Sequence, residues 1–231
     1  MRRLAIAVTV IGLSVSLASC DDDDEKTIEY TPIPAMTGTG TVGTAVDLGV
    51  SVLWASHNVG GATECDRGNY FAWGETAGKT SYLQRNYAFY DTEKNVVTKY
   101  DGTDGLVTLE AADDVATAKW GEAWRIPTKA EWQELCDSCK WEWKAAGEYD
   151  SEQAGYVVSN KKDAQKKIFL PAAGYCEYDR LNYAGGYGYY WASGIDTTEG
   201  DVYCLRFNDS YQTVYSTSRY MGVSVRAVSA K

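Results

Sequence analysis

The apolar stretches between residues 45 and 228 are short, and nearly all are bounded by Gly, Asn, Asp or Pro. Segments of this kind are typical of short strands joined by turns. A first strand is predicted over 46–55, and an apolar run at 70–73 follows it. The later candidates, in chain order, are 140–143, 156–159, 167–170, 189–192, 202–207 and 223–228. Residues 77–107 are polar and are interrupted by Gly and Asp, which predicts a long loop.

Two helices interrupt this pattern. Leu109, Val115 and Trp120 belong to a set at helical spacing over 109–120, and Gly121 is expected to end that helix. The second helix begins with a capping box, Thr128 to Glu131, and is expected to end near residues 136–138. Strands around two helices with short late connections predict one α+β antiparallel domain over 45–231.

The first residues predict an export signal and an anchor. Arg2 and Arg3 precede a short apolar stretch over 4–16, too short to span a bilayer. Residues 17–20, Leu-Ala-Ser-Cys, resemble the lipobox of bacterial lipoproteins, which implies a signal peptide over 1–19 and lipidation of Cys20. Residues 21–25 are all acidic and resemble the export tag of Bacteroidetes surface lipoproteins; the alternative is a solvated spacer.

Residues 20–44 are predicted to be a tether, because 26–44 contain Pro32, Pro34 and a Gly/Thr-rich run without apolar periodicity. The expected location is therefore the outer membrane, lipid-anchored and exposed at the cell surface. The chain carries 22 Lys+Arg against 32 Asp+Glu, a net charge of −10. That charge repels polyphosphate, so nucleic acid is not an expected partner.

Several separated blocks resemble a known family. Residues 124–132, Trp-Arg-Ile-Pro-Thr-Lys-Ala-Glu-Trp, are similar to a signature of C-type-lectin-like folds of the formylglycine-generating-enzyme type. Residues 46–55 and 70–76 resemble the start of the Fibrobacter succinogenes major paralogous domain, and 169–175, 190–193 and 222–226 complete that pattern. The resemblance implies a C-type-lectin-like domain of antiparallel strands with two helices, but it implies little about chemistry.

Catalysis is not expected. The cysteine pair that holds copper in formylglycine-generating enzymes has no counterpart in 218–228. His57 is the only histidine, and no Gly-x-Ser-x-Gly motif is present to build a nucleophile around it. Glu131 is explained by its capping box, and Asp101 with Asp104 by a turn. No cofactor and no metal are predicted, and a divergent enzyme remains the less favoured class.

Five cysteines follow Cys20, and an exported compartment permits disulfides. The family resemblance implies that Cys65 pairs with Cys139 or Cys136. Cys176 and Cys204 lie on predicted late strands and are candidates for a second bridge.

Tyrosine is concentrated near the C-terminus. Residues 175–220 contain ten of the 18 tyrosines, interleaved with Gly, Ser and Asn, the composition of antibody binding loops. The segment also resembles the variable region of proteins diversified by retroelements. Packing within the domain is the alternative reading. The residues predicted to contact a ligand are Tyr178, Arg180, Asn182, Tyr183, Tyr187, Tyr189, Asn208, Tyr211, Tyr215 and Tyr220.

The sequence therefore predicts a surface-displayed lipoprotein that acts as a non-catalytic module and binds a glycan or protein ligand. The alternative function is a structural or assembly component of a cell-surface or fimbrial structure.

Overall fold

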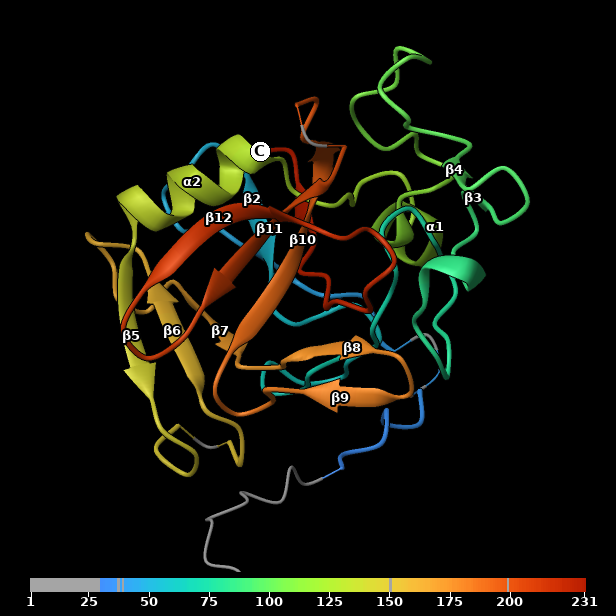
Figure 1. Ribbon diagram of the computed structural model, residues 1–231. Helices are drawn as coiled ribbons and strands as arrows, with labels where there is room; N and C mark the ends of the chain where they lie inside the picture. The colour runs from blue at the N-terminus through green and yellow to red at the C-terminus, as the bar shows by residue number, and fades with distance from the viewer. Residues whose placement is uncertain (1–29, 37, 39, 150, 199) are drawn as a thin grey trace, which may run out of the picture.

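The computed structural model describes residues 30–36, 38, 40–149, 151–198 and 200–231. The predicted signal peptide, Cys20 and the acidic run lie outside these residues. The described chain folds into small antiparallel sheets with two α-helices, which confirms the α+β class (Figure 1). Within this part of the chain, no helix is both long enough and apolar enough to cross a membrane.

Two three-stranded sheets dominate the second half of the chain. The first has the order β5–β6–β7 and the second the order β10–β11–β12. Their strands are β5 (Lys140–Lys144), β6 (Gly155–Ser159), β7 (Lys167–Pro171), β10 (Gly188–Ile195), β11 (Val202–Phe207) and β12 (Gln212–Thr217). The β8–β9 hairpin, Tyr175–Glu177 and Arg180–Asn182, lies beside the end of the second sheet from which β10 begins (Figure 1).

The two chain ends of the domain meet in a third sheet, β1–β2–β13. Its strands are β1 (Ala45–Val46), β2 (Leu53–Ala55) and β13 (Val228–Ser229). The single strand predicted over 46–55 is wrong, because a turn separates β1 from β2. The Asp47 carboxylate accepts the Gly49 N–H at 2.9 Å, and Gly49 takes a φ of +80°, which favours glycine.

The helix α2 (Lys129–Ser138) confirms the capping-box prediction. The Thr128 hydroxyl accepts the Glu131 N–H at 3.2 Å, and the Glu131 carboxylate accepts the Thr128 N–H at 2.7 Å. The other helix, α1 (Val115–Trp120), begins later than predicted. The Leu109 N–H donates instead to the Ser193 carbonyl of β10, and the Asp114 side chain caps the helix. Gly121 ends it as expected.

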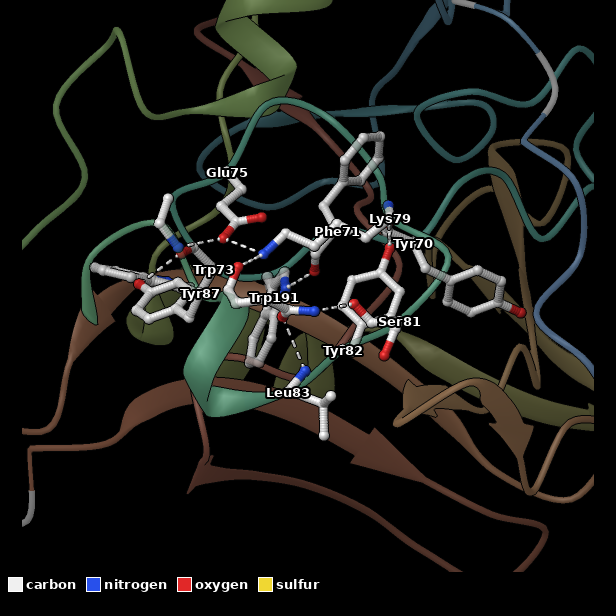
Figure 2. A network of polar contacts seen from close by, with 12 residues as sticks. Tyr70, Phe71, Trp73, Glu75, Lys79, Ser81, Tyr82, Leu83, Tyr87 and Trp191 are labelled. Atoms are coloured by element: carbon white, nitrogen blue, oxygen red, sulfur yellow. Dashed lines mark hydrogen bonds and ion pairs between the residues drawn. The ribbon is translucent and has the colours of Figure 1, made fainter. Parts of the chain in front are cut away.

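The segment 77–107 is mostly irregular, as predicted. It contains only the short 3₁₀ helix η1 (Gln84–Asn86) and the hairpin β3 (Tyr90–Asp91) and β4 (Val96–Val97). Buried side chains fix its first part to the scaffold (Figure 2). The Tyr82 hydroxyl donates to the Tyr70 carbonyl at 2.6 Å, and the Trp191 Nε1–H donates to the Phe71 carbonyl at 2.7 Å (Figure 2).

Residues 223–227 do not form the predicted strand, because they pair with several different segments in turn. Their backbone pairs with a different segment at nearly every step: Val223 with Phe71, the Ser224 carbonyl with Trp191, and the Val225 carbonyl with Val59. Only Val228 continues into β13. These residues are fully buried, so the segment is a central connector of the fold.

Arg226 in this connector is fully buried and makes four hydrogen bonds. Its Nε donates to Asn58 Oδ1 at 2.8 Å, and its Nη atoms donate to the carbonyls of Ala55, Ser56 and Phe169 at 2.8–3.2 Å. Burial lowers the pKa of Arg226 to about 10. One side chain thus joins β2, β7 and the loop after β2.

The described half of the predicted tether does not stand free. The Leu181 N–H of β9 donates to the Thr31 carbonyl at 2.8 Å, and the Thr41 N–H donates to the Gly61 carbonyl at 3.1 Å. Ile33 packs against a core cluster that contains Leu181. The described part of the predicted tether therefore contacts the domain at Thr31, Ile33 and Thr41.

Candidate functional site

The candidate site is built on one face of the β10–β11–β12 sheet. Tyr189 of β10 lies opposite Arg206 of β11, and Cys204 lies opposite Tyr215 of β12. Opposed residues of antiparallel strands share a face, as do residues two apart on one strand. The register therefore places Tyr189, Arg206 and Tyr215 on the same side of the sheet.

Aromatic rings continue from this face onto the β8–β9 hairpin. The Tyr189 ring lies 5.0 Å from that of Tyr175, which lies 5.9 Å from that of Tyr183. The Tyr187 ring lies 5.5 Å from that of Tyr183 and 6.2 Å from that of Tyr189. The Tyr215 ring lies 6.5 Å from the Tyr189 ring. These rings form one continuous chain of contacts across two sheets.

Arg206 extends the chain to the β11–β12 turn. Its guanidinium lies 4.7 Å from the Tyr215 ring centroid and 5.4 Å from that of Tyr211. We call the assembled residues the ring surface; its members are Tyr175, Tyr183, Tyr187, Tyr189, Arg206, Tyr211 and Tyr215.

The rings of this surface differ in burial. Tyr183 is 61% exposed, whereas Tyr189 is 6% exposed and lies beneath its neighbours. Burial raises the pKa of the Tyr189 and Tyr215 hydroxyls, and the nearby Arg206 charge opposes that rise. The surface therefore has a packed base and an exposed rim.

Tyr183 also has an uncommon backbone. Its φ is +56°, a left-handed conformation that is an outlier for a bulky side chain. Tyr178, in the turn between β8 and β9, has the same φ and is 57% exposed. Strained backbone that holds an exposed side chain is found more often at functional sites than elsewhere.

Five of the ten predicted contact residues belong to the ring surface: Tyr183, Tyr187, Tyr189, Tyr211 and Tyr215. Asn182 lies at its border, opposite Tyr175 in the hairpin. Tyr178 and Tyr220 instead line a separate cavity of about 370 Å³ together with η1. Arg180 lies over the Tyr30 ring, and the Asn208 side chain accepts N–H bonds from Ser210 and Tyr211 within the β11–β12 turn.

The strands β9 and β12 were not predicted, and Tyr215 lies within β12. Sequence reasoning also missed Tyr175 and Arg206 as members of the site. Arg206 lies two residues after the buried Cys204 on β11, a strand predicted over 202–207, and this spacing places both side chains on one face.

The predicted disulfides are not formed in this structure. Among the described residues, none of the cysteines is joined to another, and Cys139, Cys176 and Cys204 belong to three different core clusters. Burial raises the pKa of the thiols of Cys136, Cys139 and Cys176 to about 12, 11 and 12. Such thiols are poor nucleophiles at neutral pH.

The other polar candidates have structural partners. His57 is buried and its ring nitrogens lie within hydrogen-bond distance of the Thr41 carbonyl and the Ser56 hydroxyl, at 3.0 Å each. Asp101 accepts the N–H groups of Thr103 and Asp104 in a turn. In the part of the chain that the structure describes, no three His, Cys, Asp or Glu side chains gather as a metal site would require.

A second concave feature lies between α1, α2 and β10. This cavity of about 490 Å³ is lined by Leu109, Asp114, Arg125 and Ser193, among others. Two of its charged groups, Asp114 and Arg125, already have partners. The Asp114 carboxylate accepts N–H bonds from Ala116, Thr117 and Ile126, and Arg125 pairs with Glu131. The ring surface is therefore the stronger candidate for recognition.

Comparison with known proteins gives one family match. The model of a family described as a domain of unknown function (DUF8237) matches residues 155–228, which span the chain from β6 to β13. The matched part contains every member of the ring surface. No curated protein and no solved structure matches the chain.

Proposed function

We propose that this chain is a lipid-anchored protein of the outer membrane, displayed at the cell surface, whose C-type-lectin-like domain binds a ligand without catalysis. The observation that carries the proposal is the ring surface, on which tyrosines from β8, β10, β12 and the intervening loops come together. Tyr side chains give large amphipathic contacts at a low entropic cost.

The distribution of burial supports a binding role over simple packing. The scaffold tyrosines Tyr70, Tyr82 and Tyr87 are at most 3% exposed, and each hydroxyl donates to a backbone carbonyl. Tyr183 is mostly exposed, yet its ring is held by Tyr175 and Tyr187. A large ring that is ordered by its neighbours and left open to solvent is prepared for contact.

The test is a ligand screen with a matched pair of variants. The purified full chain is screened on a glycan array and with a displayed random peptide library, and each hit is measured again with Tyr183→Ala and Tyr178→Ala. These two tyrosines share the same φ and nearly the same exposure, but only Tyr183 belongs to the ring surface. The proposal expects hits that Tyr183→Ala weakens and Tyr178→Ala does not. Equal effects of the two variants on every hit, or no effect of either, would contradict it.

The proposed location has its own test. Protease treatment of intact cells that express the chain should release the folded domain, and substitution of Cys20 by Ala should release the protein into the soluble fraction. A domain that is protected from external protease would overturn surface display.

A further inference from the structure

The ring surface contains a cation that lacks an acidic partner. Arg206 makes ring contacts with Tyr211 and Tyr215, but its Nε is buried and has no hydrogen-bond partner among the described residues. Within the same residues, no carboxylate lies within ion-pair distance of its guanidinium. By contrast, the chain's fully buried arginine, Arg226, uses all three guanidinium nitrogens as donors.

A guanidinium in this position is costly to leave unpaired. A buried donor without an acceptor loses its hydration without compensation, and a charged donor loses more than a neutral one. The flanking tyrosine rings attract the cation, but they provide no acceptor for the Nε–H. The remaining N–H groups of the fork match the two oxygens of a carboxylate.

We infer that Arg206 is the anchor of the ring surface and that it binds a carboxylate side chain, Asp or Glu, of a protein partner. This inference rests on the proposed binding function and names the chemistry of the ligand. Arg206 lies opposite Tyr189 of β10 and beside the Tyr211 and Tyr215 rings, so a carboxylate bound to its guanidinium would have aromatic neighbours.

The composition and shape of the site favour a protein over a sugar acid. Tyr and Arg are the residue types that most often carry the binding energy of protein interfaces, where a ring of neighbouring contacts excludes water. Tyr183 is 61% exposed, so most of its surface is open to a partner. The net charge of −10 disfavours a polyanion, whereas a single carboxylate opposite a single guanidinium is locally neutral.

The experiment selects peptides from a displayed random library on the purified full chain and measures each selected peptide against variants. Arg206→Gln removes the charge and keeps a donor, and Arg206→Lys keeps the charge but removes the planar fork. The selected peptides should share an acidic residue, and Arg206→Gln should weaken them at least about tenfold. Arg206→Lys should restore part of the loss, because the charge is kept without the two-point geometry.

Folding is measured on the same variants. Since the buried Nε of the Arg206 side chain has no hydrogen-bond partner among the described residues and the substitution leaves the backbone pairing of β11 intact, Arg206→Gln should leave the melting temperature nearly unchanged. A variant that melts much earlier and binds as the native chain does would make Arg206 a structural residue and overturn the inference.

Further outcomes separate the inference from the proposed function. Peptides that need Tyr183 but are indifferent to Arg206→Gln would overturn the inference and leave the binding function standing. Binding of glucuronate, but not of glucose, that Arg206→Gln abolishes while no peptide is selected would assign the carboxylate to a sugar acid and overturn the protein partner. A library and a glycan array that both give no ligand dependent on the ring surface would overturn both proposals.

Discussion

The side chains of Arg226 and Arg206 have opposite surroundings. Arg226 is fully buried, and its guanidinium is saturated by Asn58 and three backbone carbonyls. Arg206 lies among half-buried rings with an unpaired Nε. The hydrogen bonds of Arg226 are complete within the chain, whereas we propose that a ligand provides the partner of Arg206. The scaffold around Arg226 therefore satisfies its own buried polar groups, whereas the ring surface leaves one of its own, the Arg206 Nε, without a partner.

The two regions use tyrosine in correspondingly different ways. The hydroxyls of Tyr70, Tyr82 and Tyr87 each donate to a backbone carbonyl, and Tyr82 and Tyr87 belong to the polar network of Figure 2. On the ring surface, the tyrosines mainly contact one another's rings and the Arg206 guanidinium. Residue type alone therefore does not tell a structural tyrosine from a contact tyrosine; the partner of its hydroxyl does.

The largest expected effect concerns the scaffold at alkaline pH. Cys139 and Cys176 are buried, and burial raises their thiol pKa to about 11 and 12 in the folded chain. An unfolded thiol ionises near pH 8.5, so above that pH only the unfolded state releases these protons and stability falls with rising pH. The loss is about 1.4 kcal/mol per pH unit for each thiol, or about 5 kcal/mol by about pH 10.5.

Urea unfolding from pH 7 to 10.5 measures this loss, and the double variant Cys139→Ala/Cys176→Ala should have a shallower slope. A native chain whose slope equals that of the double variant would show that these cysteines do not titrate as thiols, as expected if disulfides join them.

The next effect is the difference in folding stability between variants of the two arginines. Arg226→Met should cost about 4 kcal/mol of folding stability, because several buried acceptors lose their donors at once. Arg206→Met should cost less than about 0.5 kcal/mol, since the chain loses no hydrogen bond there. Urea denaturation of both variants gives the two values side by side; similar losses would remove the distinction between scaffold and surface.

Tyr183→Ala tests the surface alone. Removal of this exposed ring should cost about 2 kcal/mol of binding, near thirtyfold in affinity for a selected ligand, and less than about 0.5 kcal/mol of folding stability. Calorimetric titration and thermal melting of the same preparation report the two quantities. Tyr178→Ala is the control, because it shares the backbone conformation and the exposure but faces another cavity.

The smallest expected effect is the loss of folding stability when the N-terminal cap of α2 is removed. Thr128→Ala removes the hydroxyl that caps α2 and should cost about 1 kcal/mol of folding stability, with no change in affinity, because α2 carries no ring-surface residue. Thr128→Ser keeps the hydroxyl and should restore most of the stability. An equal loss in both variants would mean that the methyl group, and not the cap, is what matters.

Local signals predicted the scaffold well where a single segment determines its own structure. The Thr128–Glu131 box fixed the start of α2, and Gly121 fixed the end of α1. Prediction failed where contacts with distant segments of the chain determine the local backbone structure. Residues 223–228 look like a strand, but Val223, Ser224 and Val225 pair with three different segments. Leu109 lies outside the helix, and its N–H donates to the Ser193 carbonyl of β10.

The candidate site was predicted in part for the same reason. The density of Tyr, Gly and Asn pointed to the right region, and five of the predicted contact residues come together. Their burial could not be read from composition: Tyr187 and Tyr215 pack against the core, so their truncation should also destabilise the fold, unlike that of Tyr183. Arg206 was missed because its role depends on the register of three strands.

The most direct test of the account combines the changes on the surface. The triple variant Tyr183→Ala/Arg206→Gln/Tyr211→Ala is melted alongside the native chain and alongside Arg226→Met. If the ring surface is separable from the scaffold, the triple variant should lose less than about 5 °C while Arg226→Met loses about 10 °C or more, and only the triple variant should fold and fail to bind a selected peptide. A triple variant that melts as early as Arg226→Met would show that the ring surface belongs to the folding core, and would contradict the account.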